Sequence, residues 1–147
     1  MNTRAFGSGR PVSLFTLGTM RALNSAEQMA EVLDAAEDAG INHLETAPAY
    51  GPAERFLGEA LRQNSRTGSD HWVITSKLLP GLSFEEGQRR LDQILERLGC
   101  PQLDNLAIHG INREEHLDWA LVGDGSRLLD WAVSLSLIHI SEPTRPS

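Results

Sequence analysis

The stretch GINHLETAPAYG at residues 40–51 decides the fold of this chain. Its apolar start, residues 41–44, predicts a short buried strand, and the Pro and Gly residues after it predict a loop. Upstream, residues 25–39 carry apolar side chains at helical spacing. Downstream, a second helix is expected over about residues 52–63. The stretch is therefore a strand and a loop set between two helices.

Strand and helix patterns alternate along the rest of the chain. Strands joined through helices run parallel, because the chain must return along the sheet, and such crossovers are right-handed. A short hairpin is expected over residues 3–12, before the first of these units. Further strands are expected at residues 12–17, 72–75 and 106–108, and further helices at residues 83–98 and 112–121. Capping boxes are expected at Ser25 with Gln28, Ser83 with Glu86, and Asn112 with Glu115.

Two α/β folds fit this alternation, an open doubly wound sheet and a (β/α) barrel. The doubly wound fold carries a GxGxxG turn after its first strand, whereas this chain has only LGTM at residues 17–20. The polar residues expected at three strand ends, Glu45, Lys77 and His109, are spaced 32 residues apart. A barrel of eight units has roughly 31 residues per unit. The sequence therefore favours a partial TIM (β/α)8 barrel, with about the first four βα units.

Composition excludes several classes of protein. At 147 residues the chain has room for about one domain, and 40% hydrophobic with 22% charged residues is ordinary for a folded one. The net charge of −7 argues against nucleic acid as a partner. No apolar run is long enough to span a membrane and no secretory signal is visible, so we expect a cytoplasmic protein with no membrane partner.

Metal sites are not expected either. A single cysteine, Cys100, allows neither an internal disulfide nor an iron–sulfur cluster held by this chain alone. His43, His71 and His116 come from different parts of the repeating units and lack the spacing of a zinc site.

The chain has twelve arginines but one lysine, Lys77, and one tyrosine, Tyr50. Because lysine is a compact donor with a tunable pKa and arginine is not, a lone lysine suggests a chemical role. An ammonium stabilises a neighbouring phenolate, so Lys77 would make Tyr50 a better proton donor. Glu45 would aim Lys77, and His109 would polarise a carbonyl oxygen. Such a set suits hydride transfer to a carbonyl carbon.

Three segments together resemble the aldo-keto reductase family: residues 40–51, ITSK at residues 74–77, and LDNLAIH at residues 103–109. The first resembles the family motif in which Asp-Thr-Ala runs into Tyr-Gly. The other two resemble its catalytic-lysine and catalytic-histidine strands. The resemblance covers about residues 14–121 and implies a (β/α)8 barrel that reduces aldehydes or ketones, as small-molecule substrates, with NADPH.

The resemblance also implies two sets of site residues. The catalytic set is Glu45, Tyr50, Lys77 and His109, and the set beside the nicotinamide of the cofactor is Gly18, Thr19, Met20 and Glu45. Glu45 stands where the family usually has Asp, which keeps the charge and adds one methylene. The sequence of residues 43–46 and 108–112 is most similar to that of a branch of the family whose members often carry a C-terminal iron–sulfur segment. We expect such a cluster only in a longer relative.

We expect residues 1–133 to form the N-terminal part of a barrel. Residues 134–147 resemble translated sequencing adapter and are expected to be a non-native tail. Four units cannot close an eight-stranded barrel, so this chain alone is expected to be inactive. Because apolar surface stays uncovered, it is expected to aggregate, associate or remain partly molten. The alternative is a non-catalytic barrel of the same family that binds a nucleotide and a partner protein. The substrate, the choice between NADPH and NADH, and the oligomeric state stay open.

Overall fold

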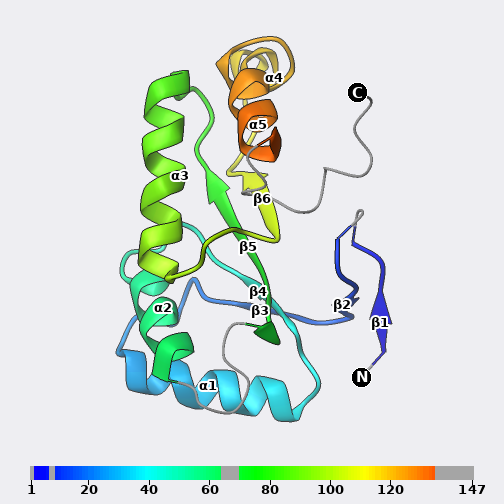
Figure 1. Ribbon diagram of the computed structural model, residues 1–147, viewed down its shortest axis with the longest axis vertical. Helices are drawn as coiled ribbons and strands as arrows, with labels where there is room; N and C mark the ends of the chain where they lie inside the picture. The colour runs from blue at the N-terminus through cyan, green and yellow to red at the C-terminus, as the bar shows by residue number, and fades with distance from the viewer. Residues whose placement is uncertain (1, 7–8, 64–69, 135–147) are drawn as a thin grey trace.

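A computed structural model describes residues 2–6, 9–63 and 70–134. Four parallel strands form one sheet in chain order, with helices between them (Figure 1). The strands are β3 (Thr16–Gly18), β4 (His43–Glu45), β5 (Val73–Leu78) and β6 (Asn105–Ile108). The helices are α1 (Ala26–Asp38), α2 (Ala53–Gln63), α3 (Phe84–Leu98), α4 (Glu114–Leu121) and α5 (Asp124–Ser134). This order confirms the predicted α/β fold and is that of part of a TIM barrel.

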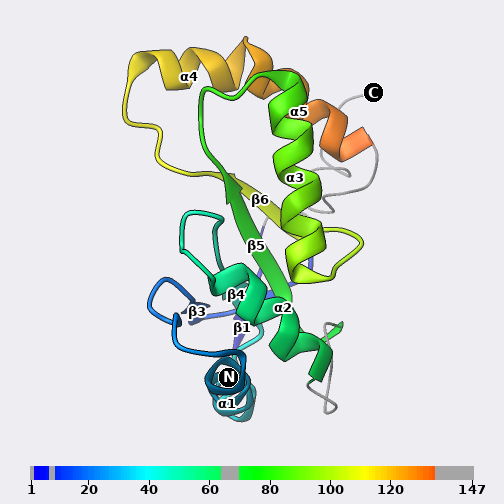
Figure 2. The ribbon, with the colours of Figure 1, turned by 90° about the vertical axis from the view of Figure 1, so that its left-hand side faces the viewer.

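Helices α1, α2 and α3 lie along one side of the sheet (Figures 1 and 2). Successive side chains of a strand point to opposite faces. Leu44, Ile74 and Leu78 join the buried core with apolar residues of these helices, whereas Glu45 and Lys77, each one residue away from a core position, face the other side. One face of the sheet therefore supplies the core, and the other is free to carry polar groups.

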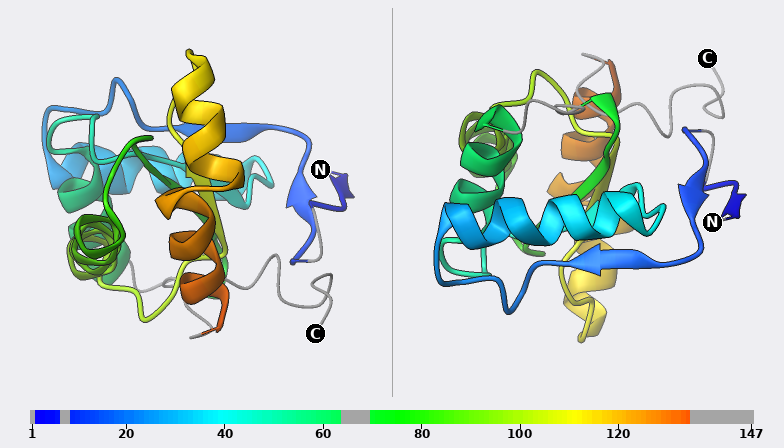
Figure 3. Two further views of the ribbon diagram at one scale, coloured as in Figure 1. Left: turned by 90° about the horizontal axis from the view of Figure 1, so that it is seen from above. Right: turned by 90° about the horizontal axis from the view of Figure 1, so that it is seen from below.

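The expected hairpin is confirmed, but one predicted strand is divided in two. Strands β1 (Thr3–Arg4) and β2 (Val12–Ser13) pair antiparallel, and the parallel sheet starts only at β3. The hairpin lies on the side of the sheet away from α2 and α3 (Figures 1 and 3). There the ring of Phe6 lies 5.1 Å from that of His43.

Two of the three predicted capping boxes have the expected N-cap bond. Ser25 accepts a hydrogen bond from the N–H of Gln28, and Ser83 accepts one from the N–H of Glu86, both at 3.1 Å. The third prediction, Asn112 with Glu115, is wrong. Arg113 is the N-cap of α4 and makes no side-chain cap bond, while the N–H of Asn112 donates to Nδ1 of His116.

Helix α5 was not expected from the sequence. It packs against α3, where Leu128 is fully buried and a Cβ added at Gly87 would lie 2.1 Å from its side chain. The helix ends at Ser134, the first residue of the predicted tail. The remainder of that tail, residues 135–147, lies outside the described residues.

Candidate active site

Glu45 and Tyr50 are placed by the end of β4 and the turn after it. Glu45 is the last residue of the strand. The turn is closed by two backbone bonds, from the N–H of Tyr50 to the carbonyl of Ala47 at 3.1 Å and from the N–H of Ala53 to the carbonyl of Tyr50 at 3.2 Å. Gly51 follows with φ of +58°, a left-handed conformation that favours glycine. The turn brings the phenol back to the side chain of Glu45.

Three of the predicted catalytic side chains form one hydrogen-bonded set, Glu45, Tyr50 and Lys77, which we call the Tyr50 cluster. The hydroxyl of Tyr50 donates to Oε1 of Glu45 at 3.1 Å and accepts a hydrogen bond of 2.6 Å from Nζ of Lys77. Lys77 also forms an ion pair with Oε1 of Glu45. The longer Glu45 side chain, in place of the Asp usual in the family it resembles, therefore reaches both partners.

His109 lies against the same phenol. Its ring meets that of Tyr50 edge-on, with centroids 5.8 Å apart and planes at 80°. Its backbone N–H donates to the carbonyl of Leu78 on the neighbouring strand at 2.8 Å. The structure thus brings all four predicted catalytic residues together where β4, β5 and β6 end.

Lys77 is largely buried, and its ammonium lies against the phenol of Tyr50. Only 14% of its side chain is exposed, and burial lowers the pKa of Lys77 from its ordinary value. Contact with the carboxylate of Glu45 acts in the opposite direction, because an opposite charge favours the ammonium form. The ammonium also lies 4.6 Å from the ring centroid of Tyr50. A positive charge is therefore held directly against the oxygen that would lose a proton.

The three predicted cofactor residues at the end of β3, Gly18, Thr19 and Met20, differ in exposure and contacts. Gly18 pairs in register with Glu45 and is exposed, as is Met20. Thr19 is fully buried, and its hydroxyl lies 2.8 Å from that of Thr46. The N–H of Thr19 donates to the carbonyl of Glu45 at 3.1 Å. Gly18 and Met20 are thus available to a ligand, whereas Thr19 joins two loops of the site.

A small recess opens beside Lys77 and His109. Its volume is about 30 Å³, room for a group of one or two heavy atoms. Most of its wall is apolar. The lining residues are Pro48, Ala49, Lys77, Leu78, Leu79, Leu82, Arg90 and His109.

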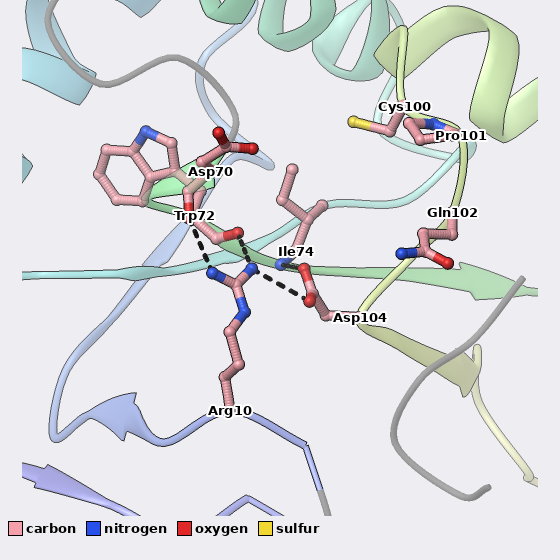
Figure 4. A pocket seen from close by; sticks show the side chains of 8 residues that line it. All are labelled: Arg10, Asp70, Trp72, Ile74, Cys100, Pro101, Gln102 and Asp104. Carbon is pink, nitrogen blue, oxygen red and sulfur yellow. Dashed lines mark hydrogen bonds and ion pairs between the residues drawn. The ribbon is translucent and has the colours of Figure 1, made fainter. Parts of the chain in front are cut away.

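A larger hollow, of about 250 Å³, lies at the opposite end of the strands (Figure 4). Arg10 crosses it and donates to the carbonyls of Asp70 and Trp72, both at 2.7 Å, and to the carboxylate of Asp104 at 3.1 Å. Asp104 also accepts from the N–H of Ile74. These contacts tie the N-terminal hairpin to the sheet. In barrels of this type the chemistry is at the carboxyl ends of the strands, so we do not assign the reaction to this hollow.

Sequence reasoning missed one buried acid near the site. Glu54, in the first turn of α2, is 1% exposed. Its carboxylate accepts from Oγ of Ser76 at 2.7 Å and from Nε of Arg97 at 2.9 Å. Its position one turn before Leu57 and Gly58, on the buried face of α2, is the signal that could have identified it.

Neither a metal-binding group nor a membrane-spanning helix is found in the described part of the chain. Within residues 2–6, 9–63 and 70–134, no three His, Cys, Asp or Glu side chains are grouped to hold a metal ion. No helix over the same residues is long and apolar enough to cross a membrane.

Comparison with known proteins supports the resemblance seen in the sequence. The sequence model of the Aldo/keto reductase family matches residues 14–135. An L-glyceraldehyde 3-phosphate reductase of Escherichia coli is 29% identical over 109 residues, which are 65% of this chain and 32% of that protein. An aldo-keto reductase of Mycolicibacterium vanbaalenii is 36% identical over 87 residues, 59% of this chain and 30% of that protein.

Solved structures of aldo-keto reductases share the fold of this chain. A putative aldo-keto reductase from Pseudomonas aeruginosa superposes with a TM-score of 0.81 and 30% identity, over 92% of this chain and 56% of that one. The holo form of an aldo-keto reductase from Bacillus halodurans has a TM-score of 0.78 and 21% identity, over 94% of this chain and 48% of that one. The chain therefore spans about half the length of these structures and a third of the two curated relatives.

Proposed function

The chain belongs to the aldo/keto reductase family, and from this we propose that its site reduces an aldehyde or ketone to an alcohol with NADPH as the hydride donor. The observation that carries the proposal is the 2.6 Å hydrogen bond from Lys77 to the hydroxyl of Tyr50, with Glu45 touching both. A phenol so placed can give a proton to a substrate oxygen and leave a phenolate beside an ammonium.

The roles of the residues follow from this geometry. Bound NADPH would supply the hydride that reduces the carbonyl carbon. Tyr50 gives its proton to the carbonyl oxygen as the C–O double bond becomes single, and the phenolate that remains is stabilised by Lys77. Glu45 holds Lys77 in place through the ion pair. His109, whose ring touches that of Tyr50, can donate a hydrogen bond to the same carbonyl oxygen.

Gly18 and Met20, exposed at the end of β3, leave room for a cofactor beside the Tyr50 cluster. Gly18 is exposed beside Glu45, and a Cβ at Gly18 would lie 3.7 Å from Oε2 of Glu45. Glycine leaves this space free, so a flat ring could approach the carboxylate and the phenol. Gly18 and Met20 would line the cofactor side, and the recess beside Lys77 and His109 would take a small substituent of the substrate.

The test replaces the matching segment of the Pseudomonas aeruginosa relative with residues 14–133 of this chain, so that both halves of the family fold are present. Aldehyde-dependent loss of NADPH absorbance measures turnover. Tyr50→Phe is expected to lower turnover by roughly a hundredfold or more, with NADPH binding little changed. His71→Asn, a change at the amino-terminal end of β5, is the control and is expected to retain turnover.

Turnover that persists in Tyr50→Phe would refute the role of the phenol. The chimera with residues 14–133 unsubstituted is the reference. If it binds NADPH but has no turnover, the non-catalytic alternative is favoured. The 147-residue chain alone is assayed in parallel, and we propose that it shows no turnover.

A further inference from the structure

Glu54 is a buried carboxylate that the proposed reaction does not use. It is 1% exposed, and burial raises the pKa of Glu54, although its hydrogen bonds to Ser76 and Arg97 and the charge of Arg97 act against the rise. Placing a charge in the interior costs free energy unless it is paired and hydrogen-bonded. Arg97 and Ser76 supply that pairing. Apolar residues in place of the whole buried pair are often no less stable, so the pair is weak evidence for a role in stability alone.

The position of these groups in the chain supplies one. Glu54 follows Tyr50 by four residues, across the turn in which the N–H of Ala53 donates to the carbonyl of Tyr50. Ser76 directly precedes Lys77 on β5 and points to the helix side of the strand, whereas Lys77 points to the Tyr50 cluster. The hydrogen bond from Ser76 to Glu54 therefore joins the two segments that carry the phenol and the ammonium.

Arg97 completes the attachment from a third element. It lies in the last turn of α3 and holds Oε1 of Glu54 through Nε and a second nitrogen, at 2.9 and 2.8 Å. Helix α2 also passes very close to α3 here, because a Cβ at Gly58 would lie 2.0 Å from the carbonyl oxygen of Arg97. The start of α2 is thus fixed against both β5 and α3.

We propose that Glu54 is a positioning residue of the Tyr50 cluster, which acts through Ser76 to hold the turn of Tyr50 against the strand of Lys77. Its importance for catalysis rests on the proposed function. The contact between Lys77 and Tyr50 that Glu54 is proposed to maintain can be tested independently of that function. The chain offers a direct probe of this contact. Tyr50 is the only tyrosine and Lys77 the only lysine of the 147 residues, so a tyrosine labelled with ¹³C at Cζ gives a signal from Tyr50 alone.

The experiment records the ¹³Cζ resonance of Tyr50 in the 147-residue chain under folding conditions. Lys77→Met sets the position of the resonance when the hydrogen bond from Lys77 is absent. Glu54→Gln removes the charge with little change of shape, and Ser76→Ala removes the donor with an even smaller change. Asp104→Asn is the matched control, because Asp104 also pairs with an arginine and binds β5, but at the opposite end of the strand. Urea unfolding of each variant gives its stability.

In Glu54→Gln and Ser76→Ala the resonance is expected to move most of the way to its position in Lys77→Met. Amine acylation at Lys77, followed by peptide mass analysis, is expected to be roughly tenfold faster in both, the factor that follows from losing one hydrogen bond to a charged group. Asp104→Asn is expected to lower the urea midpoint and leave the resonance and the acylation rate unchanged.

A resonance that stays at the wild-type position in folded Ser76→Ala would overturn the proposal, and so would a control that moves it equally far. If Glu54→Gln does not fold, Ser76→Ala alone decides the question. The readout is the contact between two side chains, so a protein without reductase activity could still confirm the positioning role. Loss of that role would equally leave the proposed reaction standing.

Discussion

Nζ of Lys77 lies 2.6 Å from the hydroxyl oxygen of Tyr50, although 27 residues separate them in the chain. The contact exists because both segments end at the same edge of a parallel sheet, Lys77 on β5 and Tyr50 in the turn after β4. Glu45, the last residue of β4, contacts both members of the pair. Each member of the Tyr50 cluster is therefore in contact with the other two.

The length of the Glu45 side chain is a first point to test. Its Oε1 touches both Tyr50 and Lys77, and a carboxylate one methylene shorter is expected to keep only one of these contacts. In the chimera with the Pseudomonas aeruginosa relative, Glu45→Gln is expected to lower kcat roughly tenfold or more, because the charge-assisted contact to Lys77 is lost. Glu45→Asp is expected to give an intermediate kcat. Steady-state kinetics checks both, and a Glu45→Gln protein with unchanged kcat would contradict the role.

The crossing of α2 and α3 gives a second prediction. A Cβ at Gly58 would lie 2.0 Å from a backbone oxygen of Arg97, whereas one at Gly87 would meet the end of the Leu128 side chain at 2.1 Å. Backbone cannot move away without shifting a helix, but a leucine can change rotamer. Gly58→Ala is therefore expected to destabilise by about 3 kcal/mol or more, and Gly87→Ala by about 1 kcal/mol. Urea unfolding of the two variants measures the difference, and equal losses would contradict this account.

The parts of the fold that were predicted from sequence are those fixed by local chemistry. Ser25 and Ser83 cap helices because a serine oxygen accepts a nearby N–H wherever the chain turns into a helix. The strand expected at residues 12–17 is divided because Val12 pairs with β1, and Leu14 and Phe15 lie exposed between the two pieces. Such a break depends on the hairpin partner, which a pattern of apolar residues does not contain.

The same distinction holds for the site. Glu45, Lys77 and His109 could be predicted because polar residues at the carboxyl ends of parallel strands meet at one edge. Glu54 was missed although it lies on the buried face of α2, because a glutamate in the first turn of a helix is normally solvated and favoured there by the helix dipole. Only the approach of Arg97 from α3 and Ser76 from β5 makes it a buried, paired group.

His43 gives a third prediction, for stability in acid. Its two ring nitrogens each lie 2.9 Å from a threonine hydroxyl, of Thr16 and of Thr75. Burial lowers the pKa of His43 from 6.5, although the charge of Asp104 acts against the fall. The unfolded chain therefore binds this proton more readily, so the free energy of unfolding is expected to decrease as the pH falls below 6.5. Above that value the contribution is fully present.

Urea unfolding at a series of pH values between about 7 and 5 measures this effect. His43→Gln keeps a polar side chain at the position and removes the titration, so the difference between the wild-type and variant slopes isolates His43. The subtraction matters because Glu54, whose pKa is raised, contributes with the opposite sign. Identical slopes in the two proteins would show that His43 is not held in its neutral form.

Cys100 gives the last prediction, at the end of the sheet opposite the Tyr50 cluster. It lines the 250 Å³ hollow, so small reagents can approach it. Burial raises the pKa of the Cys100 thiol above 9.0, with a further rise from the charge of Asp104 and a partial offset from Arg62. Because the thiolate is the nucleophile, the folded chain is expected to react with a thiol reagent at pH 8 roughly tenfold more slowly than the urea-unfolded chain. Cys100 is the only cysteine, so the absorbance of the chromophore that the reagent releases reports this site alone.

Asp104→Asn is expected to speed the reaction of the folded chain, because it removes a charge that disfavours the thiolate. A folded chain that reacts as fast as the unfolded one would contradict the assignment.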